Sequence, residues 1–322
     1  MLLQLRLVGL EINVKAAYIK QYGDIDKVVQ IGDMPKPKML LHDTLIEVRA
    51  AGVNPVDWKI AEGHLKNVVP LNLPAILGSD VTGVVVDIGD VVTRFQRGDE
   101  VFARVNLARS GSFAEYVSVD EKIVALKPKN IDFVQAAGVP LAALTAWQAL
   151  FENIQLQQGQ KILIHGGAGG VGTFAIQFAK YIGAQVATTV SAENVTLAEE
   201  LGADWVIDYQ TQRFEEVLQD FDAVLDTVGG DTQTRSMEVL KSGGVLASTV
   251  GVVSKIKKPA IRIEPVVAHP DGIQLSEISQ LIEAEQVQPV IDRSFPLGKI
   301  KEALRYSQSG HAKGKIVLEI KK

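Results

Sequence analysis

One glycine-rich run constrains the fold of this chain more than any other feature. Residues 162–172 read ILIHGGAGGVG, in which the spacing of Gly167, Gly169 and Gly172 matches G-x-G-x-x-G. A short apolar strand precedes the glycines, and residues 170–182 follow with apolar side chains on one helical face. Here the glycines allow a tight turn, a close approach to a pyrophosphate, and close packing of helix on strand. The run predicts a dinucleotide site at a helix N-terminus, formed by Gly167, Gly169, Gly170, Val171 and Gly172.

The pattern of the chain changes on either side of this run. Before about residue 128, β-branched segments bounded by Gly, Pro or Asp predict strands over 14–19, 44–50, 81–88, 100–103 and 113–119. Strands then alternate with helices, the strands covering 161–165, 185–190, 205–208, 221–227, 245–249 and 261–268. Alternation predicts a parallel sheet with helices on both faces, because parallel strands need crossover connections. From Pro289 onward the chain again resembles the strand-rich part before residue 128, and it ends in a strand over 315–320.

We therefore predict an α/β fold in which a doubly wound parallel Rossmann sheet is inserted in a β-rich domain. The expected domains are 1–137, 138–287 and 288–322, the last of which returns to the first. Residues 1–13 are interpreted as an extra segment ahead of the first strand. A signal peptide is not expected there, because Arg6 and Glu11 interrupt the apolar stretch and it has no small-residue cleavage site.

The residues after the second strand of the alternating region bear on which dinucleotide binds. NAD sites usually place an Asp or Glu there to accept from the ribose 2′-hydroxyl, and this chain has Thr189 instead. A carboxylate would repel a 2′-phosphate, whereas Ser191, Asn194 and Tyr209 offer donors to it, so NADPH is expected. The alternative is that Ser191 and Asn194 only cap a helix. The loop lacks Lys and Arg, and the tail could supply the cation from Lys313 or Lys315.

Composition excludes several classes of function. The chain has no Cys, which rules out disulfides, Cys-ligated zinc and a Cys nucleophile, and fits the reducing cytoplasm. A formal charge of -5 does not indicate the positive charge that would attract nucleic acid or an anionic membrane. No run reaches the roughly 18 consecutive apolar residues of a membrane span. We therefore expect a cytoplasmic protein that acts on a small molecule, with no nucleic-acid or membrane partner.

Further stretches identify the family that the chain resembles. They read AGVNPVD (51–57), LGSDVTG (77–83), GDEVF (98–102), GSFAEY (111–116), AALTA (142–146), LGAD (201–204) and GKIV (314–317). With the glycine run, and in this order, they resemble the medium-chain dehydrogenase/reductase superfamily in its zinc-free quinone oxidoreductase branch. The resemblance covers nearly the whole chain from Val14. It implies a GroES-like substrate domain, a Rossmann domain, an active site in the cleft between them, and a homodimer.

The chain departs from the zinc-bearing members of that superfamily at the metal ligands. In those members a Cys follows the strand that ends in an Ala-Gly-Val-type sequence, and a His-Glu pair follows the Gly of a later turn. This chain has Asn54, and then Ser79 and Asp80. None of its five His residues forms a spaced pair typical of a ligand set. The resemblance therefore implies no catalytic metal.

The resemblance also implies which residues line the cleft. Asn54 is the leading candidate to donate to the acceptor oxygen or to the nicotinamide-side ribose, unless it only begins the Asn54-Pro55 turn. Thr145 matches the family threonine beside the nicotinamide, unless its hydroxyl only bonds its own helix backbone. Trp58 and Lys59 are candidate substrate residues, although a solvated surface position is the simpler interpretation of Lys59. The nicotinamide is expected near three residues at strand ends, Val228, Val250 and Gly251.

These residues favour an NADPH-dependent reductase that moves a hydride to quinones or α,β-unsaturated carbonyls without metal. Conjugation suits such acceptors, because it spreads the negative charge that develops. Two alternatives stay open. One is an enoyl-thioester reductase, for which the nearest basic residues are Lys255, Lys257 and Lys258, and the other is an NADPH-binding protein without activity. The apolar run over 261–267 predicts an exposed edge strand, which favours a homodimer.

Overall fold

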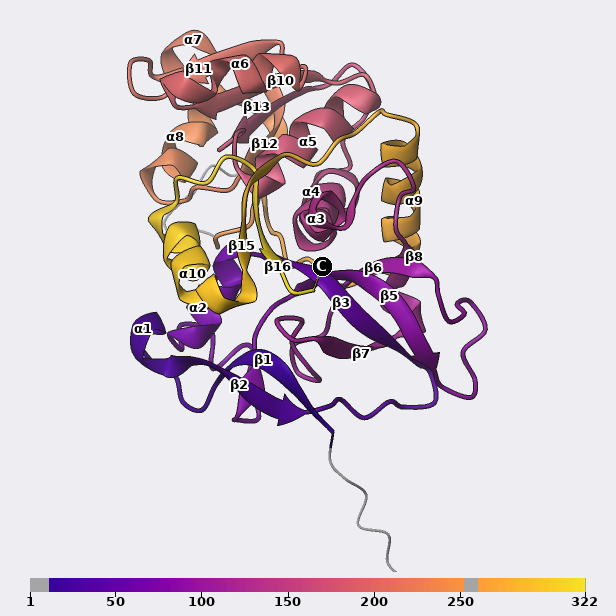
Figure 1. Ribbon diagram of the computed structural model, residues 1–322. Coiled ribbons are helices and arrows are strands. Elements are labelled where there is room, and N and C mark those ends of the chain that lie inside the picture. The colour runs from indigo at the N-terminus through magenta and orange to yellow at the C-terminus, as the bar shows by residue number, and fades with distance from the viewer. Residues whose placement is uncertain (1–11, 252–259, 322) are drawn as a thin grey trace, which may run out of the picture.

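The computed structural model describes residues 12–251 and 260–321, which form two domains with the end of the chain between them (Figure 1). In this described part, the upper domain of Figure 1 holds a six-stranded sheet in the order β11-β10-β9-β12-β13-β14. Each neighbouring pair runs parallel. This is the strand order of a doubly wound dinucleotide-binding sheet, with its switch point between β9 and β12. The predicted Rossmann sheet is confirmed.

Four of these strands match the predicted segments to within one residue, whereas β13 begins five residues before the predicted 245–249 and β14 is shorter than the predicted 261–268. The strands are β9 (Lys161–His165), β10 (Gln185–Val190), β11 (Trp205–Asp208), β12 (Phe221–Asp226), β13 (Leu240–Ser248) and β14 (Arg262–Pro265).

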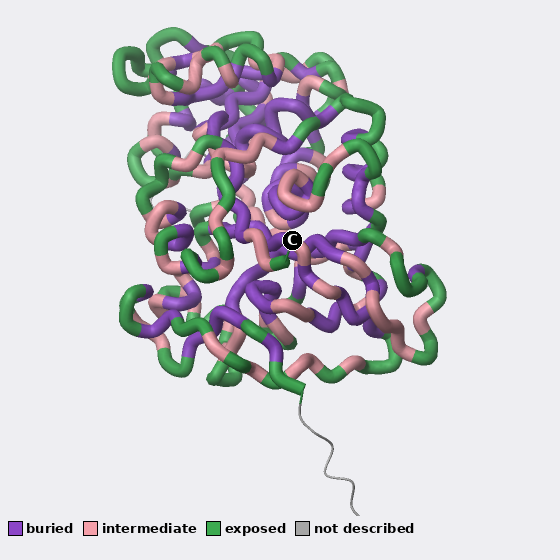
Figure 2. The backbone as a smooth tube through the Cα atoms, viewed as in Figure 1, coloured by how far each residue is buried: buried purple, intermediate pink, exposed green. Residues whose placement is uncertain are grey.

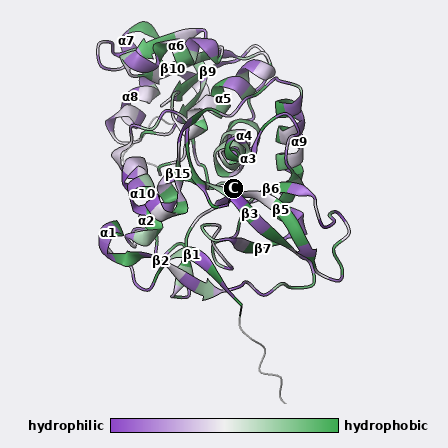
Figure 3. Ribbon diagram, viewed as in Figure 1, coloured by the Kyte–Doolittle hydropathy of each residue, from purple (hydrophilic) through white to green (hydrophobic). Residues whose placement is uncertain are grey.

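The sheet forms because apolar side chains of its central strands are buried on both faces. Ile162 and Ile164 of β9 belong to one core cluster with Phe178, whereas Leu163 between them belongs to another with Phe214. Alternate residues of a strand point to opposite faces, so each face needs its own layer of helices. Figure 2 shows the central strands and α4 as buried, and Figure 3 colours much of α4 as hydrophobic.

The helices of this domain cover both faces of the sheet. They are α4 (Pro140–Gln148), α5 (Gly170–Tyr181), α6 (Val195–Glu200), α7 (Phe214–Val217), α8 (Asp231–Val239) and α9 (Gly272–Glu283). A π-helical segment, Ala149–Ile154, continues α4. Among the described residues, no helix combines the length and apolarity that a membrane span requires.

The lower domain is β-rich. Of the described strands, seven form one sheet in the order β15-β16-β3-β5-β6-β8, with β7 also paired to β3, and three form a second sheet, β2-β1-β4. In chain order these are β1 (Asn13–Ile19), β2 (Val29–Pro35), β3 (Asp43–Val53), β4 (Ala75–Ile76), β5 (Asp80–Ile88), β6 (Glu100–Arg104), β7 (Tyr116–Asp120), β8 (Val124–Leu126), β15 (Ile291–Pro296) and β16 (Lys315–Glu319). The helices beside them are α1 (Ile25–Val28), α2 (Pro55–Ala61), α3 (Phe133–Ala137) and α10 (Ile300–Ser309).

The end of the chain returns to this β-rich domain. β16 pairs antiparallel with β3 and parallel with β15, so its residues join the sheet built by the start of the chain. The predicted insertion of the Rossmann sheet in a GroES-like domain is confirmed. The boundaries between residues 137 and 138 and between 287 and 288 stay predictions.

Several elements differ from the predicted pattern for local reasons. Residues 29–35 form β2, although Gly32 and Pro35 resemble turn signals, because an edge strand tolerates both. The Asn54-Pro55 turn opens α2, because proline is well suited to the first position of a helix. Asp231 has the residue type of an N-cap, but Gly230 is the N-cap of α8 and Asp231 is its first helical residue.

Candidate functional site

The glycine-rich turn joins β9 to α5 in a conformation that only glycine fits at two positions. A Cβ atom on Gly167 would lie 2.0 Å from a side-chain oxygen of β10, and one on Gly172 would lie 2.2 Å from the carbonyl oxygen of Gly166. Gly169 is the N-cap of α5 and makes no side-chain capping bond. Within residues 12–251 and 260–321, the N–H groups of the first turn, from Gly170 onward, have no side-chain partner, so they can bind an anion.

The end of the chain lies against this turn. Gly314 forms an isolated parallel bridge with Gly169, directly before β16. A Cβ atom on Gly170 would lie 2.7 Å from Lys315 Cδ, so the lysine stem packs against the start of α5. Val171, in the same turn of helix, packs partly buried against the core. The structure thus brings Lys315 together with the predicted cofactor-binding glycines.

Three of the four residues predicted near the adenosine ribose lie together beyond the end of β10. Asn194 Nδ2 donates to Ser191 Oγ at 2.9 Å. The backbone N–H of Tyr209 donates to the carbonyl oxygen of Val190 at 3.1 Å, which places the exposed tyrosine beside the same strand end. Glu193 Oε1 lies 3.4 Å from Ser191 Oγ. This strand end therefore presents hydroxyl and amide donors, with one carboxylate close to them.

Thr189 belongs instead to a buried network beneath the glycine turn. It is 5% exposed, and its Oγ1 lies 3.0 Å from His165 Nδ1. His165 Nε2 lies 2.9 Å from Ser236 Oγ, which itself donates to the carbonyl oxygen of Thr232. The ring therefore donates from Nε2 and accepts at Nδ1. Burial lowers the pKa of His165 to about 4, so the ring is neutral near pH 7 and the Thr189 hydroxyl faces the interior.

Exposed valine side chains lie at the ends of β12 and β13. The buried carboxylate of Asp226 forms hydrogen bonds at both strand ends. Asp226 Oδ1 accepts from the backbone N–H of Val228 at 3.0 Å. Asp226 Oδ2 lies 3.0 Å from Ser248 Oγ, which also lies 2.9 Å from the carbonyl oxygen of Gly251. Val228 and Val250 are 56% and 45% exposed. The residues predicted near the nicotinamide thus lie together, and they offer an apolar surface to a ring at the carboxyl ends of parallel strands.

A buried polar cluster links the start of α5 to the β-rich domain. Asn54, which is 1% exposed, donates from Nδ2 to Asp80 Oδ2 at 2.9 Å and to a backbone carbonyl of β3 at 3.4 Å. Lys315 Nζ donates to Asn54 Oδ1 and lies 3.7 Å from Asp80 Oδ2. Asp57 accepts from the Asn54 N–H at 2.7 Å and from Ser79 Oγ at 3.1 Å. Both amide hydrogens and the amide oxygen of Asn54 are therefore used within the protein.

Burial sets the charge state of this cluster. Burial, together with the charge on Asp80, raises the pKa of Asp57 to about 7. Burial also raises the pKa of Asp80 and lowers that of Lys315, while the attraction between these two opposes both shifts. The Lys315 ammonium acts on both carboxylates, and the charge on Arg104 also acts on Asp80.

The remaining predicted cleft residues have defined surroundings. Thr145 Oγ1 donates to the carbonyl oxygen of Leu141 at 2.6 Å, which is the backbone bond considered as the alternative to a role beside the nicotinamide. Trp58 is partly buried, and among the described residues its Nε1 has no hydrogen-bond partner. Lys59 Nζ lies 5.5 Å from the centre of the Trp58 ring. Lys255, Lys257 and Lys258 lie outside the described residues.

Two charged residues of this region, Asp57 and Arg104, are not predicted from the sequence to belong to the site. Asp57 stands three positions after Asn54, which is the capping-box spacing, so a search for helix caps finds it. Arg104 ends β6 after a buried apolar run, and it stands opposite Asp80 of β5. Only the strand pairing reveals that position.

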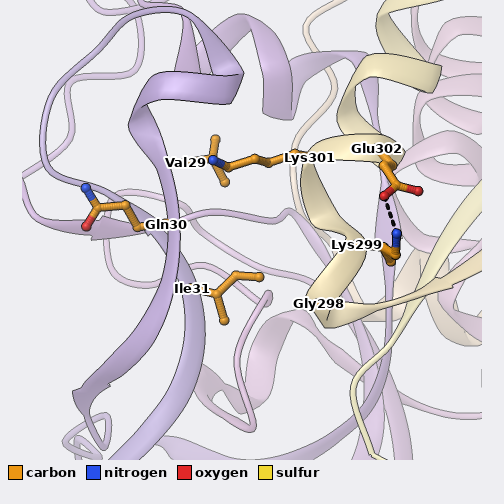
Figure 4. A pocket seen from close by; sticks show the side chains of 7 residues that line it. All are labelled: Val29, Gln30, Ile31, Gly298, Lys299, Lys301 and Glu302. Atoms are coloured by element: carbon orange, nitrogen blue, oxygen red, sulfur yellow. Dashed lines mark hydrogen bonds and ion pairs between the residues drawn. The ribbon is translucent and has the colours of Figure 1, made fainter.

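A separate surface groove lies on the β-rich domain. It has a volume of about 470 Å³ and is lined by residues 29–31 of β2 and by residues 298, 299, 301 and 302 at the start of α10 (Figure 4). Lys299 and Glu302 pair with each other across part of it. Its lining includes none of the glycine-turn or cluster residues, so we assign it no part in the site.

Known proteins match this chain over both domains. Residues 201–318 match the family described as "Zinc-binding dehydrogenase", and residues 41–129 match "Alcohol dehydrogenase GroES-like domain". The chloroplastic NADPH-dependent alkenal/one oxidoreductase of Arabidopsis thaliana is 38% identical in an alignment of 316 residues that covers 95% of this chain and 79% of that protein. The 2-methylene-furan-3-one reductase of Solanum lycopersicum is 36% identical over 97% of this chain and 80% of that protein.

A solved structure gives the same assignment. The quinone oxidoreductase from Coxiella burnetii superimposes with a TM-score of 0.88 at 33% identity, covering 96% of this chain and 100% of that chain. The chain belongs to the medium-chain dehydrogenase/reductase superfamily, in the branch of the quinone oxidoreductases and alkenal/one reductases.

Proposed function

We propose that this protein is an NADPH-dependent, zinc-independent reductase of quinones and α,β-unsaturated carbonyl compounds. One observation carries the proposal. The uncapped start of α5 and the Asn54 cluster are joined through Lys315, and the exposed Val228 lies beside Gly166 of the glycine turn. That region offers places for an anion and for a ring, next to the β-rich domain that matches the GroES-like family.

The residues of this region fit a reduced nicotinamide dinucleotide, which when bound supplies a hydride. The N–H groups at the start of α5 would hold the pyrophosphate. Val228 and Val250 would pack on the nicotinamide, and Gly251 beside them leaves the ring room. Lys313 is exposed and precedes Gly314, so it is the tail cation that can still reach an anion, whereas Lys315 is occupied inside the cluster.

The preference for NADPH rests on the end of β10. A 2′-phosphate there would accept from Ser191, Asn194 and Tyr209. The Asp or Glu that binds the ribose 2′-hydroxyl in NAD sites is missing. The Arabidopsis relative is named as NADPH-dependent, which supports the same choice. Because Thr189 is buried, we assign it no contact with the cofactor.

Independence from zinc rests on the Asn54 cluster. Asn54, Ser79 and Asp80 stand where zinc-bearing members have their ligands, and the Lys315 ammonium already lies among them. A second cation there would meet Coulomb repulsion in a buried site. Metal analysis of the purified protein is expected to find no stoichiometric zinc, and activity is expected to survive treatment with a chelator.

The experiment that tests the proposed function is an acceptor panel. NADPH and NADH oxidation are measured with a quinone, an enone, a saturated aldehyde and an enoyl thioester. We expect turnover of the quinone and the enone with NADPH. Turnover of the thioester alone would favour the enoyl-thioester alternative, and intact NADPH binding without any turnover would favour a binding protein.

Two further expectations complete the proposal. The edge position of β14 supports a homodimer in which two Rossmann sheets pair. We retain the cytoplasm as the proposed compartment because the chain has no Cys, and no nucleic-acid or membrane partner is proposed.

A further inference from the structure

We propose that Arg104 is the residue that binds the acceptor oxygen and stabilises the negative charge that develops on it. This inference rests on the proposed function, since it names the donor that such a reaction requires. Asn54 does not fill that role in this structure, because its amide hydrogens are bonded to Asp80 and to a backbone carbonyl.

The Arg104 guanidinium makes no hydrogen bond or ion pair with the part of the chain that the structure describes. Its Nη1 is fully covered, and among the described residues it has no hydrogen-bond partner. No described carboxylate lies within ion-pair distance of its guanidinium. Burial lowers its pKa, and only the charge on Asp80 opposes that shift. A covered N–H donor that lacks an acceptor costs free energy in the folded protein, so the lack of an acceptor for Nη1 in this part of the chain points to a ligand.

Strand pairing places the Arg104 side chain at the buried cluster. Arg104 stands directly opposite Asp80 in the antiparallel pair of β6 and β5, and such residues project from the same face of the sheet. On that face Asp80 accepts from the backbone N–H of Leu141 at 2.8 Å and from Asn54 at 2.9 Å, and Lys315 lies 3.7 Å away. Asp80 is thus already hydrogen-bonded to other groups, and Arg104 Nη1 has no acceptor among the described residues. The residue as a whole is partly exposed, so a ligand can reach it.

The charge that Arg104 would meet follows from the reaction. When a hydride reaches the β-carbon of an enone, the C=C electron pair moves to the bond between the α-carbon and the carbonyl carbon. The C=O π pair then moves onto oxygen, giving an enolate, and a proton from water later adds to the α-carbon. The oxygen therefore gains charge in the transition state. A guanidinium offers several coplanar N–H donors to such an oxygen, and charge-assisted bonds are the strong ones.

The test uses a probe that reports the charge on oxygen without any turnover. 4-Nitrophenol is titrated with the protein at a pH where the phenol and the visibly coloured phenolate coexist. Wild type is expected to bind the phenolate in preference, which raises its absorbance. Arg104→Met should lower phenolate affinity about tenfold to hundredfold, the value of a hydrogen bond to a charged group. Arg104→Lys should fall between them, and Arg97→Met, at an exposed arginine paired with Asp87, should match wild type.

Thermal unfolding separates a ligand-binding role from a structural one. Arg104→Met removes no hydrogen bond or ion pair within the described part of the chain, only a longer-range attraction to Asp80, so its midpoint should stay close to that of wild type. A lowered midpoint with unchanged phenolate affinity would overturn the proposal, because Arg104 would then serve the fold.

The acceptor panel separates this inference from the proposed function. If wild type reduces enones and Arg104→Met does so with an equal kcat/KM, Arg104 is not the oxyanion donor although the function stands. If no acceptor is reduced but phenolate binding still depends on Arg104, the oxyanion site stands and the proposed function fails.

Discussion

Asp57 shows how burial converts one carboxyl group into a source of pH dependence. Its folded pKa of about 7 lies far above the value of about 3.9 expected for an unfolded Asp. Between these values the folded chain binds the extra proton, so this group makes the protein less stable as pH rises from about 4 to about 7. Asp80, Lys315 and Arg104 are the charged groups that act on this region of the fold.

Replacing Asp57 with Asn should therefore stabilise the protein at high pH relative to low pH. The free energy of unfolding of Asp57→Asn minus that of wild type should increase by a few kcal/mol between about pH 4 and about pH 8, at ~1.4 kcal/mol for each unit that separates the two pKa values. Urea unfolding at both pH values measures it. Asp87→Asn is the control, because the Arg97 hydrogen bond lowers the pKa of that exposed carboxyl and gives the opposite sign. Parallel pH curves for Asp57→Asn and wild type would contradict the prediction.

The choice between NADPH and NADH should respond to charge at Ser191. Ser191→Asp places a carboxylate beside Asn194 and is expected to weaken NADPH binding at least about tenfold more than NADH binding. Glu193→Gln removes the carboxylate whose oxygen lies 3.4 Å from Ser191 Oγ, and should strengthen NADPH binding. Fluorescence titration with each cofactor measures both. Equal losses for NADPH and NADH in Ser191→Asp would show that this strand end does not meet the 2′-position.

Sequence patterns select candidate residues for the site, but they do not give the directions of the side chains. They identified the end of β10 but not that Thr189 points inward, because a strand buried on both faces has no polar alternation to reveal direction. They selected Asn54 but not its partners, since Asp80 and Lys315 are 26 and 261 positions away in the chain. Such contacts depend on tertiary structure alone.

The strand–turn–helix unit of β9 and α5 depends on two glycines for its shape. A Cβ atom at Gly172 would lie 2.2 Å from Gly166 O, whereas at Gly169 the nearest atom would be 3.3 Å away. Gly172→Ala should therefore cost about 1–3 kcal/mol of stability and abolish tight NADPH binding, whereas Gly169→Ala should cost less. Thermal unfolding and NADPH titration of the two variants test this. Equal losses of stability and of NADPH affinity in the two variants would mean that the close approach of Gly172 to Gly166 does not matter.

Elements with strong local signals were predicted well, and those without them were missed. The six Rossmann strands are apolar runs bounded by turn residues, so their existence follows from the sequence. β4 has only two residues, and β8 only three, so neither carries a readable pattern. α2 begins at a proline that also signals a turn, and the capping bond from Asp57 decides between the two.

At the scale of the whole molecule, the edge of the Rossmann sheet favours pairing of two copies. Among the described strands, β14 pairs only with β13, and Val267 just beyond it is 83% exposed. Light scattering should give twice the mass of one chain at micromolar concentration, and Val267→Lys should shift the equilibrium toward the monomer, because charge at an edge disfavours pairing. A monomeric wild type would contradict this expectation.

The proposed hydride transfer can be followed atom by atom in one experiment. Protein freed of metal by a chelator is mixed with NADPH carrying deuterium at C4 of the nicotinamide, and with an enone as acceptor. Mass and NMR spectra of the product locate the label. We expect one deuterium at the β-carbon of a saturated ketone and a solvent proton at the α-carbon, with no added zinc. A label on the carbonyl carbon, or label transfer only after zinc is restored, would contradict the proposed function.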